Sequence, residues 1–305
     1  MILSADVDGL LSASIVASAY PVRVVGIYTT KDLVLLDGAN EHDAAKALWL
    51  DHDVSEPGVR CVGQHLVHHK TTDSLPRREP ESFNPNVWRT QAWENSFSGR
   101  AGKKRDKYPY GTCHFLAEAL GIDPGDSSSP LSALLAHADG TWRTVIDYRA
   151  NALIWFRDMF EGSAFLKHLG NEWAGSEIHL AEHARIVQRL LDAGVSNSAS
   201  RAKIAALLPD DLKALTGRQS IRYTPHNPQQ FVAKVAKVLA VIAEEVGTRP
   251  VMGRSFTKAI EGVVDTPYPN RIDDFDSFMV ENAVFSHAFT DLRTLRYTTG
   301  ISLRG

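Results

Sequence analysis

The chain has 305 residues, of which 44% are hydrophobic and 23% charged, a composition typical of a globular protein and not of a disordered one. Lys and Arg total 33 against 36 Asp and Glu, so the net charge of −3 excludes a bulk polycation. No apolar run reaches the ~18 residues of a membrane span. The two cysteines are too few for a disulfide framework or a four-cysteine zinc site. We expect a cytoplasmic protein without a signal peptide or membrane contact.

Short apolar runs alternate with helical patterns in the first half of the chain. A helix is expected over 10–20, and another after Gly111 that ends near Leu120. Strands that alternate with helices predict an α/β fold with a doubly wound, mostly parallel sheet. The predicted strands are 1–5, 22–28, 33–36, 47–50 and 59–67.

The second half of the chain is expected to be largely helical, with a few strands. Helical patterns dominate from Leu131 to about Gly247, and strands are predicted near 280–289 and 294–301. The apolar stripe that begins at Phe231 is interpreted as core packing. We predict three consecutive parts: an α/β domain over 1–150, a helical connector over 151–195 and a C-terminal domain over 196–305.

Acidic residues stand where the predicted strands end: Asp6 and Asp8, Asp37, and Asp51-His52-Asp53. The carboxyl ends of strands in an open α/β sheet face the ligand crevice, so these side chains are expected to meet at one edge. Several carboxylates in one crevice repel each other unless a cation lies among them, and Mn²⁺ or Mg²⁺ suits such ligands. Two such ions are a common device for phosphoryl hydrolysis. Taken alone, Asp37-Gly38 is also typical of an ordinary turn.

These motifs resemble the DHH phosphoesterase superfamily over about the first 150 residues. Asp6-Val7-Asp8-Gly9 is similar to its first motif, Asp37 to its second, Asp51-His52-Asp53 to its third, and Asp139 to its fourth. The resemblance implies two Mn²⁺ or Mg²⁺ ions. The implied metal ligands are Asp6, Asp8, Asp37, His52 and Asp139, and the implied catalytic residues are Asp51, His52 and Asp53.

The chain departs from the family pattern at two places. Asp53 replaces the second His of Asp-His-His, and Ser4 and Ile2, neither of them a good ligand, stand where the family has a further ligand before the first motif. His65, His68 and His69 lie downstream on a predicted strand or at its end, and any one of them is a candidate to complete the site. The Asn84-Pro85-Asn86 tract resembles the Asn-Pro that often follows the third motif.

A local basic stretch at 100–107 is flanked by aromatic residues, among them Trp88 and Tyr108. Cations neutralise backbone phosphates and aromatic rings stack on bases, so the pattern favours a path for single-stranded nucleic acid. An ordinary solvated loop is the alternative. The candidate substrate-binding residues are Lys103, Lys104 and Arg105 here, with His65, Arg254 and Arg296 elsewhere.

A second motif points to a different chemistry. His179-x-x-Glu182-His183 is an inverted zincin pattern, in which two imidazoles one helical turn apart bind Zn²⁺. Such short motifs often arise by chance, and an exposed polar helix face is the ordinary explanation.

The sequence therefore predicts a metal-dependent phosphodiesterase, specifically an exonuclease of single-stranded DNA or RNA. In that interpretation 1–150 is the metal-binding catalytic domain and 196–305 binds substrate. A dinucleotide or cyclic-dinucleotide phosphodiesterase is one alternative. A nucleic-acid-binding relative with impaired catalysis, motivated by Asp53, is the other.

Overall fold

The computed structural model is an α/β structure that divides into two compact units. The first unit comprises Met1–Ser4, Val24–Tyr108 and Ser255–Gly305, and the second Ala5–Arg23 and Pro109–Arg254. Each unit thus combines segments distant in sequence, whereas the sequence pattern predicts consecutive parts. The structure describes residues 1–69, 81–89, 106–126, 128–141, 144–145, 148–160, 177–198, 218–221, 223, 225–291 and 293–303.

A mixed six-stranded sheet forms the first unit, in the order β10-β4-β3-β1-β5-β6. Strands β1, β3, β5 and β6 are mutually parallel, as the sequence predicts, but β4 runs antiparallel to both β3 and β10. The strand bounds are β1 (Ile2–Ser4), β3 (Gly26–Tyr28), β4 (Leu33–Leu36), β5 (Leu48–Leu50), β6 (Arg60–Val62) and β10 (Phe256–Ile260).

The reversal of β4 corrects the expectation that this strand is parallel. Only four residues separate Tyr28 from Leu33, the ends of β3 and β4. A parallel connection needs a crossover of a dozen or more residues, so a link this short permits only an antiparallel pair. The turn is closed by a hydrogen bond from the Thr29 amide to the Asp32 carbonyl (3.0 Å).

The sheet's apolar residues form a core that fixes the strand ends. Trp49, Ile2 and Leu35 are completely buried in one cluster. The indole N–H of Trp49 donates to the Ala44 carbonyl (2.9 Å), which ties β5 to helix α2 (Glu41–Lys46). Asn40 begins α2 with a capping box. This packing sets where the polar residues after β5 lie.

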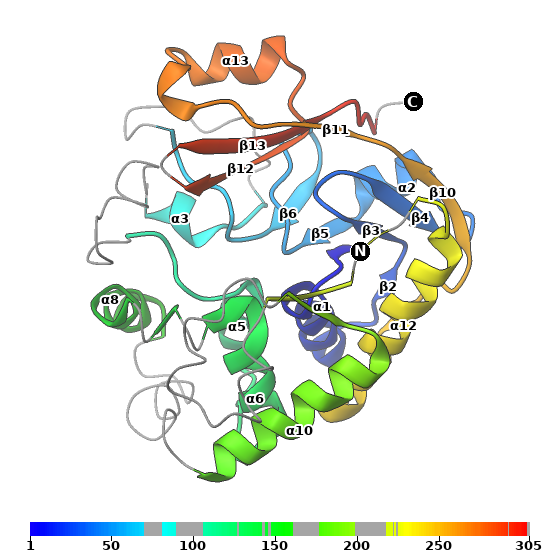
Figure 1. Cartoon of the computed structure of the whole chain (residues 1–305), viewed down its shortest axis with the longest axis vertical. Coiled ribbons are helices and arrows are strands. Elements are labelled where there is room, and N and C mark those ends of the chain that lie inside the picture. Colours follow the sequence, from blue (N-terminus) through cyan, green and yellow to red (C-terminus); the bar gives the residue numbers. More distant parts are fainter. Residues whose placement is uncertain are drawn as a thin grey trace. The chain divides into compact units, whose positions relative to one another are not determined.

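A smaller antiparallel sheet of the first unit is built from the C-terminal segment, in the order β11-β13-β12. Its β12 and β13 lie side by side (dark red in Figure 1). The strand predicted near 294–301 is confirmed by β13, but the run at 280–289 is divided between a helix end and β12. The bounds are β11 (Val263–Asp265), η3 (Pro269–Arg271), α13 (Phe275–Glu281), β12 (Ser286–Asp291), β13 (Thr294–Thr299) and, earlier in the chain, α3 (Pro85–Trp88).

Helices dominate the second unit. Helix α1 (Val7–Ala19) has small and apolar residues and is buried over most of its length. It contacts α5 (Thr112–Ala119), α6 (Pro130–His137) and α12 (Pro228–Glu245). The predicted apolar stripe from Phe231 onward is buried core of α12 (yellow in Figure 1). The other helices described in this unit are η1 (Ala138–Gly140), α8 (Arg149–Phe160) and α10 (Glu177–Ala193).

Two short strands interrupt the stretch that the sequence pattern predicts to be helical. They are β7 (Ser196–Ser198) and β8 (Arg218–Ser220), which pair antiparallel. The remaining strands, β2 (Arg23–Val24) and β9 (Val251–Met252), have two residues each.

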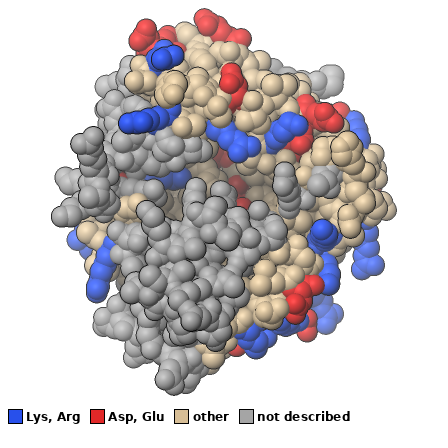
Figure 2. Space-filling view, viewed as in Figure 1, with Lys and Arg blue, Asp and Glu red and all other residues tan. Residues whose placement is uncertain are grey.

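The surface carries both signs of charge. On the face shown in Figure 2, the coloured Lys and Arg side chains are interspersed with Asp and Glu. Within the described residues, no helix combines the length and the apolar character needed to cross a membrane.

Candidate functional site

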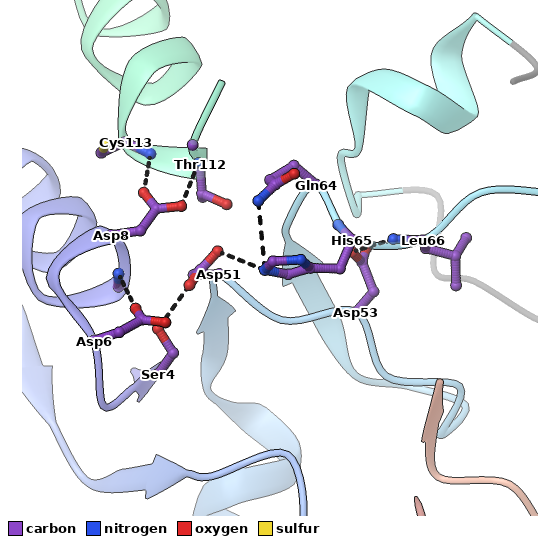
Figure 3. A network of polar contacts seen from close by, with 12 residues as sticks. Ser4, Asp6, Asp8, Asp51, Asp53, Gln64, His65, Leu66, Thr112 and Cys113 are labelled. Carbon is purple, nitrogen blue, oxygen red and sulfur yellow. Dashed lines mark hydrogen bonds and ion pairs between the residues drawn. The ribbon is translucent and has the colours of Figure 1, made fainter. Parts of the chain in front are cut away.

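A polar cluster lies at the carboxyl edge of three adjacent parallel strands of the first unit. Ser4 is the last residue of β1, Asp51 follows β5, and His65 follows β6. The Asp51 carboxylate accepts a hydrogen bond from the Ser4 hydroxyl (2.7 Å) through Oδ2. Its Oδ1 lies 3.2 Å from Nε2 of His65 (Figure 3). The edge expected to gather functional groups therefore does bring a carboxylate and an imidazole together.

Burial and neighbouring charge act in opposite directions on Asp51, which is only 2% exposed. Burial by itself raises the pKa of this carboxyl, but the charge and hydrogen bond of His65, the charge of His52 and the Ser4 hydroxyl lower it. The net pKa lies well below the usual range of an Asp. Asp51 is therefore an anion at neutral pH, and the side chain of its partner His65 is 27% exposed. Such a pair can bind a cation or exchange a proton with a ligand.

Asp53 is an internal anchor for the segment that carries His65. Its Oδ2 accepts from the backbone amides of His65 (3.1 Å) and Leu66 (3.2 Å) and from the side-chain amide of Asn84 (2.9 Å). The residue is buried. Its carboxylate thus positions the backbone of His65. The catalytic role that the family resemblance implies for Asp53 stays a prediction.

Gly63 makes room for this anchor. A Cβ atom there would lie 2.6 Å from Oδ2 of Asp53 and 2.7 Å from the carbonyl oxygen of His52. Real Cβ atoms do not approach so closely, so any larger residue would displace the Asp53 carboxylate or the backbone.

His52 belongs to the aromatic core. It packs edge-to-face on Tyr28, with ring centroids 4.9 Å apart, and also contacts Trp49. Burial lowers the pKa of His52 to about 4, although the Asp51 charge and a backbone hydrogen bond with Leu3 raise it. The imidazole is therefore neutral at pH 7, and its buried Nε2 has no hydrogen-bond partner within the described part of the chain.

Asp37 lies at the opposite edge of the sheet from Asp51. The register pairs Tyr28, the carboxyl end of β3, with Leu33, the start of β4, so β4 ends at the amino edge of its neighbours. Asp37 is exposed there, and its Oδ1 accepts from the Ser255 amide (2.9 Å). The structure therefore does not bring Asp37 to the Asp51 cluster, because β4 runs in the reverse direction.

The carboxylates of the first sequence motif act as helix caps in the second unit. Asp6 is the N-cap of α1 and accepts from the Gly9 amide (3.1 Å). Both oxygens of Asp8 accept backbone amides at the start of α5, from Thr112 (2.8 Å) and Cys113 (2.9 Å) (Figure 3). A negative charge at a helix N-terminus is stabilised by the helix dipole.

The remaining predicted site residues belong to different elements of the two units or lie outside the described residues. Asp139 is exposed in η1, a helix that contacts α1 within the second unit, Arg254 is exposed at the end of that unit, and Arg296 is exposed on β13 of the first. Lys103, Lys104 and Arg105 lie outside the described residues, as does the side chain of His179. Among the described residues, no group of three or more His, Cys, Asp or Glu side chains is placed to hold a metal ion.

Ser4 and Asn84 support the Asp51–His65 pair but were not among the predicted metal, catalytic or substrate-binding residues. Ser4 is a poor metal ligand, but its hydroxyl orients the Asp51 carboxylate. Asn84 has a recognisable signal, because Asn-Pro at the start of a short helix is an N-cap followed by Pro, and α3 does begin in this way. Its second role, as donor to Asp53, depends on tertiary structure.

Comparisons with protein-family models, with curated proteins and with solved structures found no significant match for the chain. Its function is therefore inferred from the residues of the site.

Proposed function

We propose that the chain is a divalent-metal-dependent phosphodiesterase that acts on single-stranded nucleic acid, with Asp51 and His65 at the centre of its site. The observation that carries the proposal is the ionised, buried Asp51 carboxylate held against a partly exposed imidazole, at the edge where parallel α/β sheets bind ligands. The resemblance of the first 150 residues to DHH phosphoesterases supports the reaction class.

The chemistry of these two side chains fits a hard or borderline divalent ion. An anionic carboxylate and an imidazole are ligands that Mn²⁺ accepts, and Mg²⁺ binds with one or two carboxylates plus water and phosphate oxygens. Such an ion supplies an acidified water and neutralises phosphate charge. Asp51 and His65 would hold it, Ser4 would orient the Asp51 carboxylate, and Asp53 would fix the backbone of His65.

The proposal changes the ligand set that the sequence implied. Asp37 is no longer among the proposed metal ligands because it lies at the other edge of the sheet. His65 is now proposed as a metal ligand in addition to its predicted role in substrate binding. Asp6, Asp8 and Asp139 remain candidates on the family resemblance alone. The impaired nucleic-acid-binding relative is kept as a second candidate function, because the described residues assemble no group of three metal ligands.

The test compares two isosteric carboxylate changes on the same sheet. Asp51→Asn removes the charge of the cluster, whereas Asp37→Asn keeps an acceptor for the Ser255 amide and serves as the matched control. Each protein is incubated with 5′-labelled single-stranded DNA and RNA in Mn²⁺, Mg²⁺ or a chelator. We expect metal-dependent cleavage that falls at least about 100-fold in Asp51→Asn, since even residues that only support a metal ligand cost 10–100-fold, and that is retained in Asp37→Asn.

Four results would contradict this assignment. Cleavage that survives Asp51→Asn would place the chemistry elsewhere, and cleavage that is lost only in Asp37→Asn would restore the original ligand set. Oligonucleotide binding without cleavage in any metal would favour the impaired relative. A rate that does not depend on strand length beyond two nucleotides would favour a dinucleotide phosphodiesterase.

A further inference from the structure

Helix α3 is fastened to the segment that carries His65. The Asn84 side-chain amide donates to Asp53 (2.9 Å), and that of Asn86 donates to the carbonyl of Gln64 (2.7 Å). The Gly63 amide donates to the carbonyl of Phe83, just before the helix (3.1 Å). Three hydrogen bonds, two of them between buried groups, thus couple α3 to the backbone just before His65 and to the Asp53 carboxylate, which accepts the His65 amide.

The free end of this anchored helix carries an exposed indole. Trp88 is the last residue of α3 and is 58% exposed, whereas Asn84, Pro85 and Asn86 at the other end are buried. Within the described part of the chain, no aromatic or cation–π contact involves Trp88. By contrast, Tyr268, an exposed aromatic residue of the same unit, has Arg271 over its ring at 5.0 Å.

An indole left in water is costly, because burying a large aromatic side chain contributes a few kcal/mol to stability. The flat face of the indole suits a nucleobase, which the proposed substrate would bring to this site. Every nucleobase has a π face, and unpaired bases stack on exposed aromatic side chains without requiring a particular sequence. A protein partner would instead need a complementary apolar surface, and Trp88 stands on a helix that is hydrogen-bonded to the polar segment carrying His65.

We propose that Trp88 is a stacking platform for one unpaired base of the substrate, held in fixed register with the Asp51–His65 pair by α3. This inference rests on the proposed function, because it names the part of a nucleic acid that the site recognises. Stacking would favour single strands, since a base in a duplex has both faces covered by its neighbours. Trp88 is a binding residue in this scheme and takes no part in the reaction.

The test measures binding in a chelator, so that hydrolysis plays no role. Fluorescence anisotropy follows a labelled single-stranded oligonucleotide, and an abasic sugar-phosphate strand of the same length, with Trp88→Leu, Trp88→Phe and wild type. Tyr20→Leu is the matched control, because Tyr20 is also 58% exposed. We expect Trp88→Leu to weaken binding of the base-bearing strand about 5- to 100-fold, the range typical of one lost stack. Trp88→Phe should retain most of the affinity.

The abasic strand separates stacking from a structural effect. Wild type should bind it more weakly than the base-bearing strand, and Trp88→Leu should bind it as wild type does. Equal losses on both strands would overturn the inference, as would unchanged binding in Trp88→Leu or no binding by wild type. The two proposals can fail separately. If cleavage depends on Asp51 but Trp88→Leu binds as wild type does, the stacking inference is wrong and the proposed function stands. If binding depends on Trp88 but no cleavage occurs, the stacking inference stands and the phosphodiesterase assignment is wrong.

Discussion

Acid should destabilise this protein through histidines that are buried in their neutral form, and His287 offers the clearest measurement. His287 lies on β12 and is 5% exposed, and its ring packs edge-to-face on Phe275 (5.2 Å between centroids) and near Phe289. Neither ring nitrogen has a hydrogen-bond partner within the described residues. Burial lowers the pKa of His287 to about 4, although the Asp53 charge raises it.

The magnitude follows from proton linkage. Below pH 6.5 the unfolded chain takes up a proton at His287, whereas the folded chain does so only near pH 4, so stability falls as the pH falls through this window. From these two pKa values, His287 alone costs about 2 kcal/mol of unfolding free energy between pH 7 and pH 5. His52 and His114, with pKa values that burial lowers to about 4 and about 3, add losses of the same sign.

His287→Phe isolates one share of this loss, because Phe fills a similar volume among aromatic neighbours and does not titrate. The unfolding free energy is measured in urea at pH 7 and pH 5. We expect the drop between the two pH values to be about 2 kcal/mol smaller in His287→Phe than in wild type. Leu35→Ala is the control, because Leu35 lies in the core cluster of the six-stranded sheet, to which neither His287 nor its ring neighbours Phe275 and Phe289 belong; it changes packing without removing a titratable group and should leave the drop unchanged. An equal drop in His287→Phe and wild type would refute the reasoning.

Two further substitutions test the anchor beneath His65. Asp53→Asn should destabilise the protein by about 1–3 kcal/mol, because the buried amide donors lose a charged acceptor, and should speed hydrogen exchange at the His65 and Leu66 amides. Gly63→Ala should also speed hydrogen exchange at these two amides, and overpacking should lower the unfolding free energy by about 1–3 kcal/mol. Gly38→Ala, with nothing within 4 Å of the new Cβ atom, should lose stability from its positive φ alone and leave those two amides protected. Unchanged exchange in both Asp53→Asn and Gly63→Ala would show that the anchor does not hold His65.

Local information was sufficient for much of the framework. The apolar runs predict where β1, β4, β5 and β13 lie, and the spacing of Phe231 and its followers predicts the buried face of α12, because burial of one face imposes the period of an element on the sequence. The position of Asp51 at the carboxyl end of a strand was also accessible from the sequence.

Strand direction and pairing were decided by tertiary structure. Asp37 and Asp51 look alike in sequence, since each follows an apolar strand, but the short link before β4 reverses that strand and separates the two carboxylates. The partner of Asp51 is His65, because β5 and β6 are adjacent and parallel, and the role of Asp53 as an anchor depends on Asn84, 31 residues away. Apolar periodicity records which residues are buried, but the contacts between side chains distant in sequence depend on which strands pair and in which direction, and that is settled only when the whole sheet assembles.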